Sequence, residues 1–247
     1  MAQALAWNES KIKSSAPPYH RVPAELGELR TAVGPMLAVV GEQGLAMLQY
    51  LYHRSFDPAL ARARARLAEY FDLQPASAHI ARLQAVLSAY FDGSGELQFP
   101  IDWRLIAGKF NRRALAIIQG LPVGTALTYR DLAAQAGSPA APRAAGNAMH
   151  TNPIAIFLPC HRVIGSNGSL TGYAGGLEIK RALLRHEGFT LSANDRLLGA
   201  VWGDPERGLY CEPSCARRTP AQWLIFCGAP AARKAGLSPC PNCHPLI

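Results

Sequence analysis

The stretch 152–164 constrains this chain more than any other part of the sequence. Its apolar run, 154–158, predicts a short buried strand that stops at a proline, because proline lacks a backbone donor. Cys160 follows, with His161 and Arg162 directly behind it. The pKa of a free cysteine thiol is about 8.5, so a cysteine that is nucleophilic at neutral pH needs a basic or positively charged neighbour such as His161 or Arg162. The adjacency alone leaves a packing role for Cys160 open, since most free cysteines are core residues.

Positive charge is concentrated around this stretch. The net charge of the chain is +8. Residues 101–194 carry 10 basic and 4 acidic side chains, whereas residues 1–100 carry 9 of each and residues 195–247 carry 6 and 4. A domain that binds a polyanion requires such a local excess.

The composition, 49% hydrophobic and 17% charged, indicates a globular protein. The sequence lacks an apolar run of 18 residues and an N-terminal signal core, so we expect no membrane association and no conventional export. One cysteine stands at position 160 and the other five fall in the last 37 residues. This distribution favours a reducing compartment with reactive or metal-bound thiols over a disulfide framework.

The N-terminal part of the sequence predicts an α+β unit in which we find no catalytic or metal-binding motif. Residues 1–22 read as a flexible arm. Short apolar stretches between residues 29 and 52 predict strands joined by glycine turns. Asp57-Pro58 predicts a helix start, and helical spacing of apolar residues predicts a second helix over 78–91.

The basic part predicts several helices. The first covers 109–119, the second is capped by Thr128 and ended by Gly137, and the third covers about 140–150. Two short helices around a glycine turn are typical of a helix-turn-helix, although ordinary helical hairpins share the pattern. A further helix runs from Leu177 to Glu187, where the helix dipole disfavours a carboxylate. Glu187 therefore needs a specific partner, and His161 is the natural candidate.

The C-terminal part, 195–247, is rich in proline, glycine and cysteine. Cys211 and Cys215 are separated by three residues, Cys240 and Cys243 by two, and 24 residues lie between the pairs. Four thiolates at such spacings predict tetrahedral zinc as a structural staple, with two redox dithiol pairs as the alternative. Cys227 stands alone and is expected in the core.

The motif Pro159-Cys160-His161-Arg162-Val163 resembles the active-site signature of the O6-alkylguanine-DNA alkyltransferases, also called methylated-DNA–protein-cysteine methyltransferases. The resemblance extends over residues 101–190, and residues 20–100 match only in general layout. The further matching positions are Gly124, Thr128-Tyr129, Leu132-Ala133, Gly137, Arg143, Asn152-Pro153, Gly168, Gly172-Tyr173, Gly175-Gly176, Lys180, Leu183-Leu184 and Glu187-Gly188.

The resemblance implies an α+β fold. Its parts would be a ribonuclease-H-like α/β subdomain over 23–100 and a catalytic, DNA-binding helix-turn-helix domain over 101–190. It also implies direct repair of DNA, in which an alkyl group passes from O6-alkylguanine to the cysteine thiol, with O4-alkylthymine as a further candidate substrate. A thioether is a poor leaving group, so the protein would act once, and the transfer itself would need no cofactor.

The resemblance also implies the roles of individual residues. The catalytic set would be Cys160, His161, Glu187, Asn152 and Tyr129. The DNA contacts would be Arg143, Tyr129, Ala144, Gly146 and Arg162, with Arg143 replacing the base that is flipped out of the duplex. The substrate pocket would contain Tyr173, Val163, Ala174 and Gly175. The partner would be double-stranded DNA with alkylated guanine, bound by a monomer in the cytoplasm at the nucleoid, or in a nucleus.

The segment with Cys211, Cys215, Cys240 and Cys243 resembles the zinc domain of Ada, whose first cysteine accepts methyl groups from phosphotriesters. Glu212, Pro241 and Asn242 stand where that domain has positive residues, which argues against the activity here. An alkylation-sensing DNA-binding regulator with Cys211 as acceptor is the alternative function. A cysteine hydrolase is a second alternative, which lacks a suitable glycine loop around Cys160.

Overall fold

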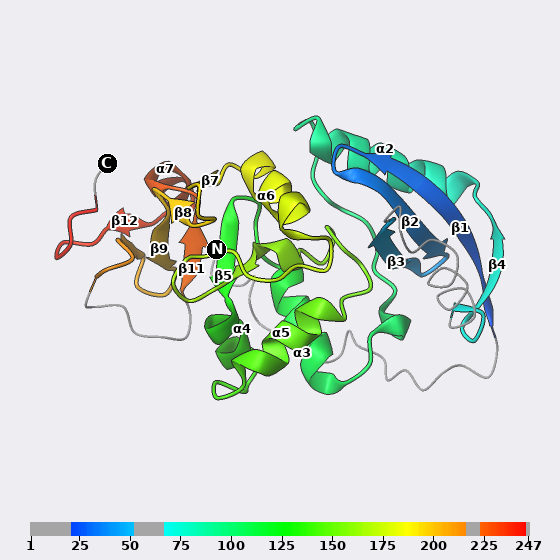
Figure 1. The fold of residues 1–247 in the computed structure, drawn as a ribbon, viewed down its shortest axis with the longest axis horizontal. Coiled ribbons are helices and arrows are strands. Elements are labelled where there is room, and N and C mark those ends of the chain that lie inside the picture. Colours follow the sequence, from blue (N-terminus) through cyan, green and yellow to red (C-terminus); the bar gives the residue numbers. More distant parts are fainter. Residues whose placement is uncertain (1–20, 52–66, 216–222, 246–247) are drawn as a thin grey trace. The chain divides into compact units, whose positions relative to one another are not determined.

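The computed structural model describes residues 21–51, 67–215 and 223–245, and the chain divides into two compact units (Figure 1). Within the described residues, the N-terminal unit comprises 21–108 and 152–157. The cysteine unit comprises 109–151 and 158–245. The expected arm, 1–22, lies almost wholly outside the described residues, as does the predicted helix start at Asp57-Pro58.

The N-terminal unit is one four-stranded sheet with a helix packed on it. Its elements are β1 (Val22–Thr31), β2 (Gly34–Gly41), β3 (Gly44–Tyr50), β4 (Phe71–Pro75), α2 (Ala78–Phe91) and the short 3-10 helix η2 (Trp103–Leu105). The sheet order is β3-β2-β1-β4, with β1 antiparallel to β2 and parallel to β4. Apolar side chains, small and large, fill the sheet core, and α2 lies along β1 and β2 (Figure 1). The strands predicted between residues 29 and 52 and the helix over 78–91 are confirmed.

A carboxylate from β1 caps the start of α2. Glu25 accepts hydrogen bonds from the backbone N–H groups of Ser77, His79 and Ile80 at 2.7, 3.2 and 3.0 Å, and from the Ser77 hydroxyl at 2.7 Å. The first N–H groups of a helix have no partner within the helix, so this side chain satisfies them and interacts favourably with the positive end of the helix dipole. Glu25 thereby fixes α2 on the sheet.

The apolar run 154–158 is buried but does not form the predicted strand. Only Ile154 makes a bridge, to Leu48 of β3, and the chain then turns. Ile156 has φ of 70°, the left-handed region that a β-branched residue rarely adopts. The turn breaks the extended geometry that a strand needs, so the strand prediction is wrong here.

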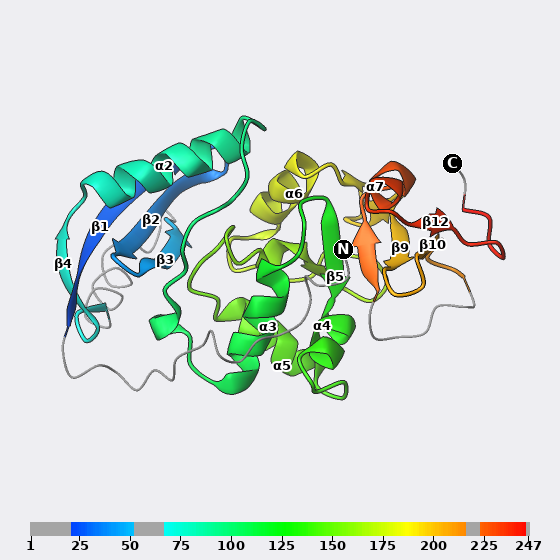
Figure 2. The ribbon, with the colours of Figure 1, turned by 180° about the vertical axis from the view of Figure 1, so that it is seen from behind.

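The cysteine unit is built on a six-stranded sheet in the order β12-β10-β9-β11-β5-β6. Figure 2 labels β12, β10, β9 and β5 of this sheet. Its helices are α3 (Lys109–Gln119), α4 (Tyr129–Gln135), α5 (Pro142–His150), η3 (Cys160–Arg162), α6 (Leu177–His186) and α7 (Ala229–Lys234). Its strands are β5 (Thr125–Thr128), β6 (Val163–Ile164), β9 (Val201–Asp204), β10 (Leu209–Cys211), β11 (Leu224–Phe226) and β12 (Ser238–Pro239), with a separate hairpin of β7 (Thr190–Leu191) and β8 (Leu197–Leu198).

The helices follow the local signals in the sequence. The helix over 109–119 is confirmed, and Thr128 caps α4 by accepting a hydrogen bond from Asp131 N–H. Gly137 ends α4 at φ of 83°, and Ser138 N–H then binds the Ala133 carbonyl in a closing turn that glycine permits. The next helix, α5, begins at Pro142, two residues later than expected, because proline suits the first position of a helix. Glu187 is the C-cap of α6.

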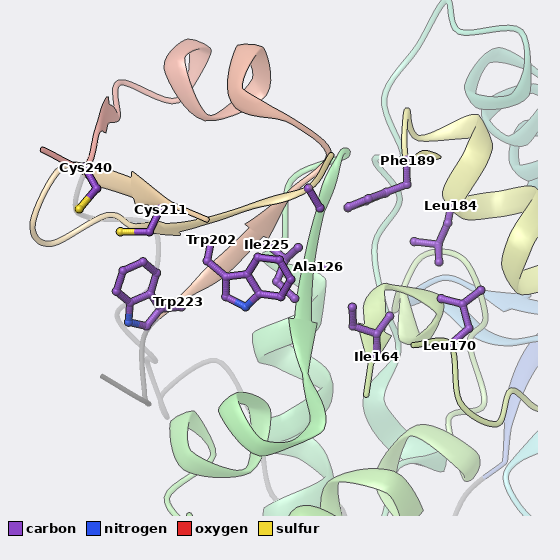
Figure 3. Packing of buried hydrophobic residues seen from close by; sticks show 11 residues of the cluster. Ala126, Ile164, Leu170, Leu184, Phe189, Trp202, Cys211, Trp223, Ile225 and Cys240 are labelled. Atoms are coloured by element: carbon purple, nitrogen blue, oxygen red, sulfur yellow. The ribbon is translucent and has the colours of Figure 1, made fainter. Parts of the chain in front are cut away.

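One hydrophobic core extends through the cysteine unit. It contains Ala126, Ile164, Leu170, Leu184, Phe189, Ala200, Trp202, Cys211, Trp223, Ile225 and Cys240 (Figure 3). The sheet and this core both cross residue 195, where the sequence predicts a domain boundary. Among the described residues, no helix combines the length and the apolar character needed to cross a membrane.

Candidate active site

Cys160 begins the short helix η3, and β6 follows this helix directly. Its side chain is buried, with 5% of its surface exposed, at the wall of a cavity of about 380 Å³. The cavity is lined by Tyr129, Gly146, Met149, His150, Cys160, Gly172, Tyr173 and Ala174. Its volume lies in the range of pockets that hold small ligands, about 300–1,000 Å³. The thiol therefore faces a space of suitable size for a substrate group.

Behind the cysteine, His161 and Arg162 share one carboxylate. His161 Nε2 lies 3.0 Å from Glu187 Oε1. Arg162 donates from Nη2 to Oε1 at 2.6 Å, from Nε to Oε2 at 2.8 Å, and from Nη1 to the Leu121 carbonyl at 2.6 Å. All three side chains are buried, with 0–4% of their surface exposed. The arginine compensates for a carboxylate at a helix C-terminus, and the carboxylate fixes the imidazole ring.

The charges of this cluster follow from its burial. Burial alone would raise the pKa of Glu187, but attraction and hydrogen bonding by His161 and Arg162 hold that pKa far below its usual value. Burial lowers the pKa of His161 below 6.5, against the pull of Glu187. An ionised carboxylate only accepts hydrogen bonds, so a neutral His161 must carry its proton on Nε2. Its other nitrogen, Nδ1, is buried and has no hydrogen bond to a described protein atom, so it is a free proton acceptor.

A buried lysine contributes positive charge near the thiol. Lys180 Nζ donates to the carbonyls of Val163 and Thr171 at 2.7 and 2.9 Å, and it lies 5.9 Å from the ring centroid of Tyr129 and 6.0 Å from that of Tyr173. Burial lowers the pKa of Lys180 to about 8, and the nearby Cys160 opposes that shift. An ammonium in this place favours a thiolate at Cys160.

Tyr129 joins the cavity to the helix pair. It is the first residue of α4, directly after β5, and its ring lines the cavity. Burial raises the pKa of Tyr129, whereas a hydrogen bond with the side chain of Thr171 opposes the rise. The phenol therefore keeps its proton at neutral pH and can act as a hydrogen-bond donor or an acid.

One face of α5 borders the cavity, and another is open to solvent. Gly146, Met149 and His150 line the cavity, whereas Arg143 is exposed one turn earlier and Ala144 is partly buried. A Cβ atom at Gly146 would lie 3.9 Å from the Tyr129 ring, which is ordinary contact distance. The small residues thus allow α5 to lie close to α4 while Arg143 remains accessible to solvent.

The geometry brings together most of the predicted site residues. Cys160, Tyr129, Gly146, Tyr173 and Ala174 line one cavity. Two predicted pocket residues do not: Val163 is fully buried in β6, and Gly175 is buried outside the lining. Asn152 belongs to the N-terminal unit, where its side chain accepts a hydrogen bond from Ile154 N–H.

The DNA contact predicted for Arg162 finds no support in the position of its side chain. The side chain is 4% exposed and its nitrogens bind Glu187 and the Leu121 carbonyl, so it has no surface to offer a phosphate. Its position directly after a cysteine and histidine suggested a positive field or a DNA contact, and the sequence carries no sign that a carboxylate 25 residues later neutralises it.

Sequence reasoning assigned no role to Lys180, Met149, His150 and Gly172, which the structure places at or beside the cavity. Lys180 carries one usable signal. Helical spacing puts it on the same side of its helix as Leu183 and Leu184, where a lysine is unexpected. Gly172 is one of the positions that match the family, whereas Met149 and His150 have no signal of their own, because their position depends on how α5 packs.

The four C-terminal cysteines converge in the cysteine unit. The sulfur atoms of Cys211, Cys215, Cys240 and Cys243 all lie within 4.8 Å of one another. Tetrahedral zinc, with Zn–S bonds of about 2.3 Å, needs sulfurs about 3.8 Å apart, so a small contraction would complete the site. Backbone N–H groups of Asn242 and Cys243 lower the pKa of Cys240 to about 7, which favours a thiolate ligand.

The four sulfurs differ in accessibility. Cys211, in β10 between β9 and β12, is 2% exposed, and Cys240 is 1% exposed, whereas Cys215 and Cys243 are partly exposed. Cys211 therefore offers almost no exposed surface to a methyl group on a DNA phosphate. Cys227, expected in the core, is partly buried and packs against it.

Comparison with known proteins identifies relatives of this arrangement. Residues 109–189 match the family model described as the 6-O-methylguanine DNA methyltransferase, DNA binding domain. A methylated-DNA–protein-cysteine methyltransferase of Salmonella typhimurium is 36% identical over 165 residues, which are 66% of this chain and 95% of the relative. A protein of the same name from Mycolicibacterium paratuberculosis is 49% identical over 102 residues, 41% of this chain and 61% of the relative.

Solved structures agree with these relatives. The crystal structure of the Mycobacterium tuberculosis O6-methylguanine methyltransferase aligns with a TM-score of 0.54 and 32% identity, covering 67% of this chain and 92% of that one. The structure of Mycobacterium tuberculosis OGT in complex with DNA aligns with a TM-score of 0.54 and 33% identity, covering 66% and 92%. About a third of this chain is left without a counterpart in each of these structures.

Proposed function

This chain belongs to the methylated-DNA–protein-cysteine methyltransferase family, and we propose that Cys160 is the residue that accepts the alkyl group. The chain repairs DNA by alkyl transfer to one of its own cysteines, as the family does. The observation that carries the assignment is the placement of Cys160 at the wall of the cavity. It lies directly before a histidine whose Nε2 is held by Glu187.

In the proposed mechanism, His161 acts as a general base. Its Nδ1 takes the Cys160 proton through a water molecule, because Nε2 is held by the Glu187 carboxylate and Nδ1 is free to accept. The positive charge on His161 that results is stabilised by Glu187. Lys180 adds positive charge beside the thiolate.

The thiolate sulfur then displaces guanine from the alkyl carbon. A carbon–sulfur bond forms as the bond between that carbon and O6 breaks, and the electron pair of that bond stays on guanine. The Tyr129 hydroxyl supplies the proton that the base takes up, and Tyr129 recovers a proton from His161. The net change moves one alkyl group to sulfur and one proton to guanine, so the transfer needs no cofactor. The carbon–sulfur bond of the resulting thioether does not break again, so the protein is consumed after one turnover.

O6 takes part in base pairing, so the substrate base must leave the duplex at a cost of a few kcal/mol. We propose that α4 and α5 act as a helix-turn-helix on DNA, with Arg143 filling the space of the extruded base. The preferred substrate is then O6-alkylguanine in double-stranded DNA. The sheet order of the N-terminal unit, three antiparallel strands with β4 parallel to β1, suits a ribonuclease-H-like subdomain.

The donor set at the C-terminus supports zinc as its metal. Four thiols that lie within 4.8 Å of one another offer the soft, tetrahedral environment that zinc prefers, and a resident zinc would supply a structural constraint there. We further propose that the protein acts as a monomer wherever the cell keeps its DNA, at a bacterial nucleoid or in a nucleus. The relatives named above are bacterial.

Intact mass spectrometry after incubation with a duplex containing O6-methylguanine tests the assignment of Cys160. We expect the protein to gain the mass of one methyl group, mapped to Cys160, with no further gain at excess DNA. Cys160→Ser should abolish the gain and still bind the duplex. Methylation of the Cys160→Ser protein at another residue would refute the assignment.

A further inference from the structure

The four-cysteine segment is continuous with the sheet that carries the reactive residues. In the cysteine unit, β11 pairs with β5, joining Ile225 to Ala126 and Phe226 to Thr125. In turn, β5 pairs with β6, joining Leu127 to Val163. Tyr129 follows β5 directly, and Cys160 lies three residues before β6. The strands that place these two side chains are therefore flanked on one side by strands from the C-terminal segment (Figure 2).

The core shows the same continuity (Figure 3). Cys211 and Cys240 lie at one end of the buried cluster, beside Trp223. Trp202, Ile225 and Ala126 occupy its middle. Ile164, at the end of β6, and Leu184, in α6, lie at the other end. Because protein interiors are close-packed, loosening one end of such a cluster changes the packing at the other.

A third contact reaches the loop behind Glu187. Cys227 N–H, just after β11, donates to the Gly124 carbonyl at 3.0 Å. Its sulfur occupies the space left by two glycines: a Cβ atom at Gly124 or at Gly188 would lie 3.4 or 3.5 Å from it. Gly188 directly follows Glu187, so the C-terminal segment packs on both the start of β5 and the end of α6.

The strands that make these contacts are short. The pairings of β12 with β10 and of β11 with β5 each involve two residue pairs. Such short strands contribute few hydrogen bonds, and their order depends on other constraints. Two of the four cysteines sit in or next to β10 and β12, at Cys211 and Cys240, and the others lie in the adjoining turns. A metal bound to all four would join the ends of this small sheet in one cross-link.

We propose that the metal held by Cys211, Cys215, Cys240 and Cys243 is a structural part of the alkyl-transfer site: it holds β9, β10 and β11 in register on β5, and so keeps Tyr129 and Cys160 in place. The inference rests on the proposed zinc site and on the proposed transfer to Cys160. It differs from a separate zinc module that contacts DNA on its own, because a module of that kind would leave transfer from the free base unaffected when it loses its metal.

Stripping zinc from the full-length protein tests the inference with two independent readouts. Zinc content is measured first. Amide hydrogen exchange of residues 125–129 and the single-turnover transfer rate are then measured on the same samples, using O6-methylguanine duplex and O6-benzylguanine as a free base. We expect exchange in 125–129 to become at least tenfold faster. Transfer from both substrates should slow by at least tenfold, and added Zn²⁺ should restore both readouts.

A matched pair of variants separates metal binding from chemical treatment. Cys215→Ser removes a partly exposed ligand, whereas Ser214→Ala changes its exposed neighbour and keeps all four thiols. Cys215→Ser should show the same fast exchange and slow transfer as the zinc-free protein, and Ser214→Ala should match the parent protein in both readouts. Ile225→Ala, which weakens β11 on β5 at a fully buried position, should slow transfer while zinc remains bound.

The outcomes distinguish the inference from the proposals beneath it. Absence of zinc from the purified protein refutes the zinc site and the inference together, and absence of alkylation at Cys160 refutes the transfer assignment. If zinc is present and Cys160 is alkylated, unchanged exchange and unchanged free-base transfer after zinc removal overturn the inference alone. Loss of DNA transfer with normal free-base transfer overturns it in favour of a separate DNA-contacting module.

Discussion

Arg162 and Glu187 form a buried, two-pronged ion pair directly behind Cys160. Nε and Nη2 of the arginine donate to separate carboxylate oxygens at 2.8 and 2.6 Å, and the oxygen bound by Nη2 also receives His161 Nε2 at 3.0 Å. The arginine thus fixes the carboxylate that fixes the histidine. Arg162 also binds the Leu121 carbonyl, so it links the end of α3 to the end of α6.

Replacing Arg162 should destabilise the protein and leave its intrinsic affinity for DNA unchanged. Arg162→Gln leaves Glu187 buried without its arginine partner, and breaking a buried ion pair costs about 3–5 kcal/mol. Arg162→Lys keeps the charge but loses the two-pronged geometry, so an intermediate loss is expected. Urea unfolding measures the stability, and binding to an unmodified duplex measures the affinity. A weaker affinity with unchanged stability would contradict this role.

His161 and Glu187 should act as one unit on the thiol. Replacing either, as His161→Gln or Glu187→Gln, should slow alkyl transfer by about 10²-fold or more, the usual effect of losing a general base. The double variant should be little slower than either single one, because both changes remove the same base. Single-turnover rates measure all three. Multiplicative losses would show that the two residues act independently.

The same pair predicts how the alkyl-transfer rate depends on pH. Protonation of His161 removes the base, and burial lowers its pKa below 6.5, so its neutral form persists to lower pH than in a free histidine. The acid limb of the transfer rate should therefore have its midpoint below 6.5, the ordinary value for histidine. His161→Gln should lack this acid limb. A midpoint above 6.5 in the parent protein would contradict the neutral assignment.

Local elements of the cysteine unit could be predicted from the sequence because their signals are local. Thr128 three residues before Asp131, and Gly137 after an apolar helix face, specify where α4 begins and ends through hydrogen bonds within ten residues. Likewise, a carboxylate at the end of a predicted helix required a partner, and the structure provides His161 and Arg162 there.

Long-range pairing could not be predicted in this way. Neither Ile225 nor Ala126 carries a sign that β11 joins β5, since strand pairing depends on the register and packing of the whole sheet. The sequence-based division at residue 195 rested on a shift in composition, which reflects turns and cysteines rather than the end of a core. The failed strand over 154–158 has the same origin, because an apolar run is buried equally well in a turn.

Lys180 should give the transfer rate an alkaline limb. Its pKa is lowered to about 8 by burial, so its ammonium is lost as pH rises through that value. Loss of the charge removes the positive field beside the thiolate, and the rate should fall above pH 8. Lys180→Met should slow transfer at pH 7 by about tenfold, equivalent to about 1.4 kcal/mol, and should lack the alkaline limb. If the rate still falls above pH 8 in Lys180→Met, a titratable group other than Lys180 causes the fall.

Glu25 should make the free energy of unfolding depend on pH in the acidic range. Burial opposes ionisation, but hydrogen bonds from Ile80, Ser77 and His79 lower the pKa of Glu25 from 4.5 to about 2. Because the folded pKa lies below the unfolded one, the stabilisation is complete above pH about 4.5 and is lost as pH falls toward 2. Glu25→Gln should cost about 1–3 kcal/mol at pH 7, and the difference from the parent should shrink below pH 4.5. Urea unfolding at pH 7 and pH 3 provides the comparison, and an equal difference at both values would contradict it.

Arg143 should contribute to DNA binding in a way that Arg162 does not. It is exposed on α5, one turn before the cavity-lining Gly146, and its charge faces solvent. Arg143→Gln should weaken binding to duplexes of any sequence, and it should reduce the slope of log affinity against log salt by about one, as expected for the loss of one phosphate contact. It should leave the free energy of unfolding unchanged, because no buried group loses a partner. Because Arg143 is proposed to fill the place of the extruded base, transfer from duplex DNA should also fall by more than binding does in Arg143→Gln, whereas transfer from O6-benzylguanine as a free base should not change. Equal rates of duplex transfer in the two proteins at saturating DNA would refute the base-replacing role and leave only a phosphate contact.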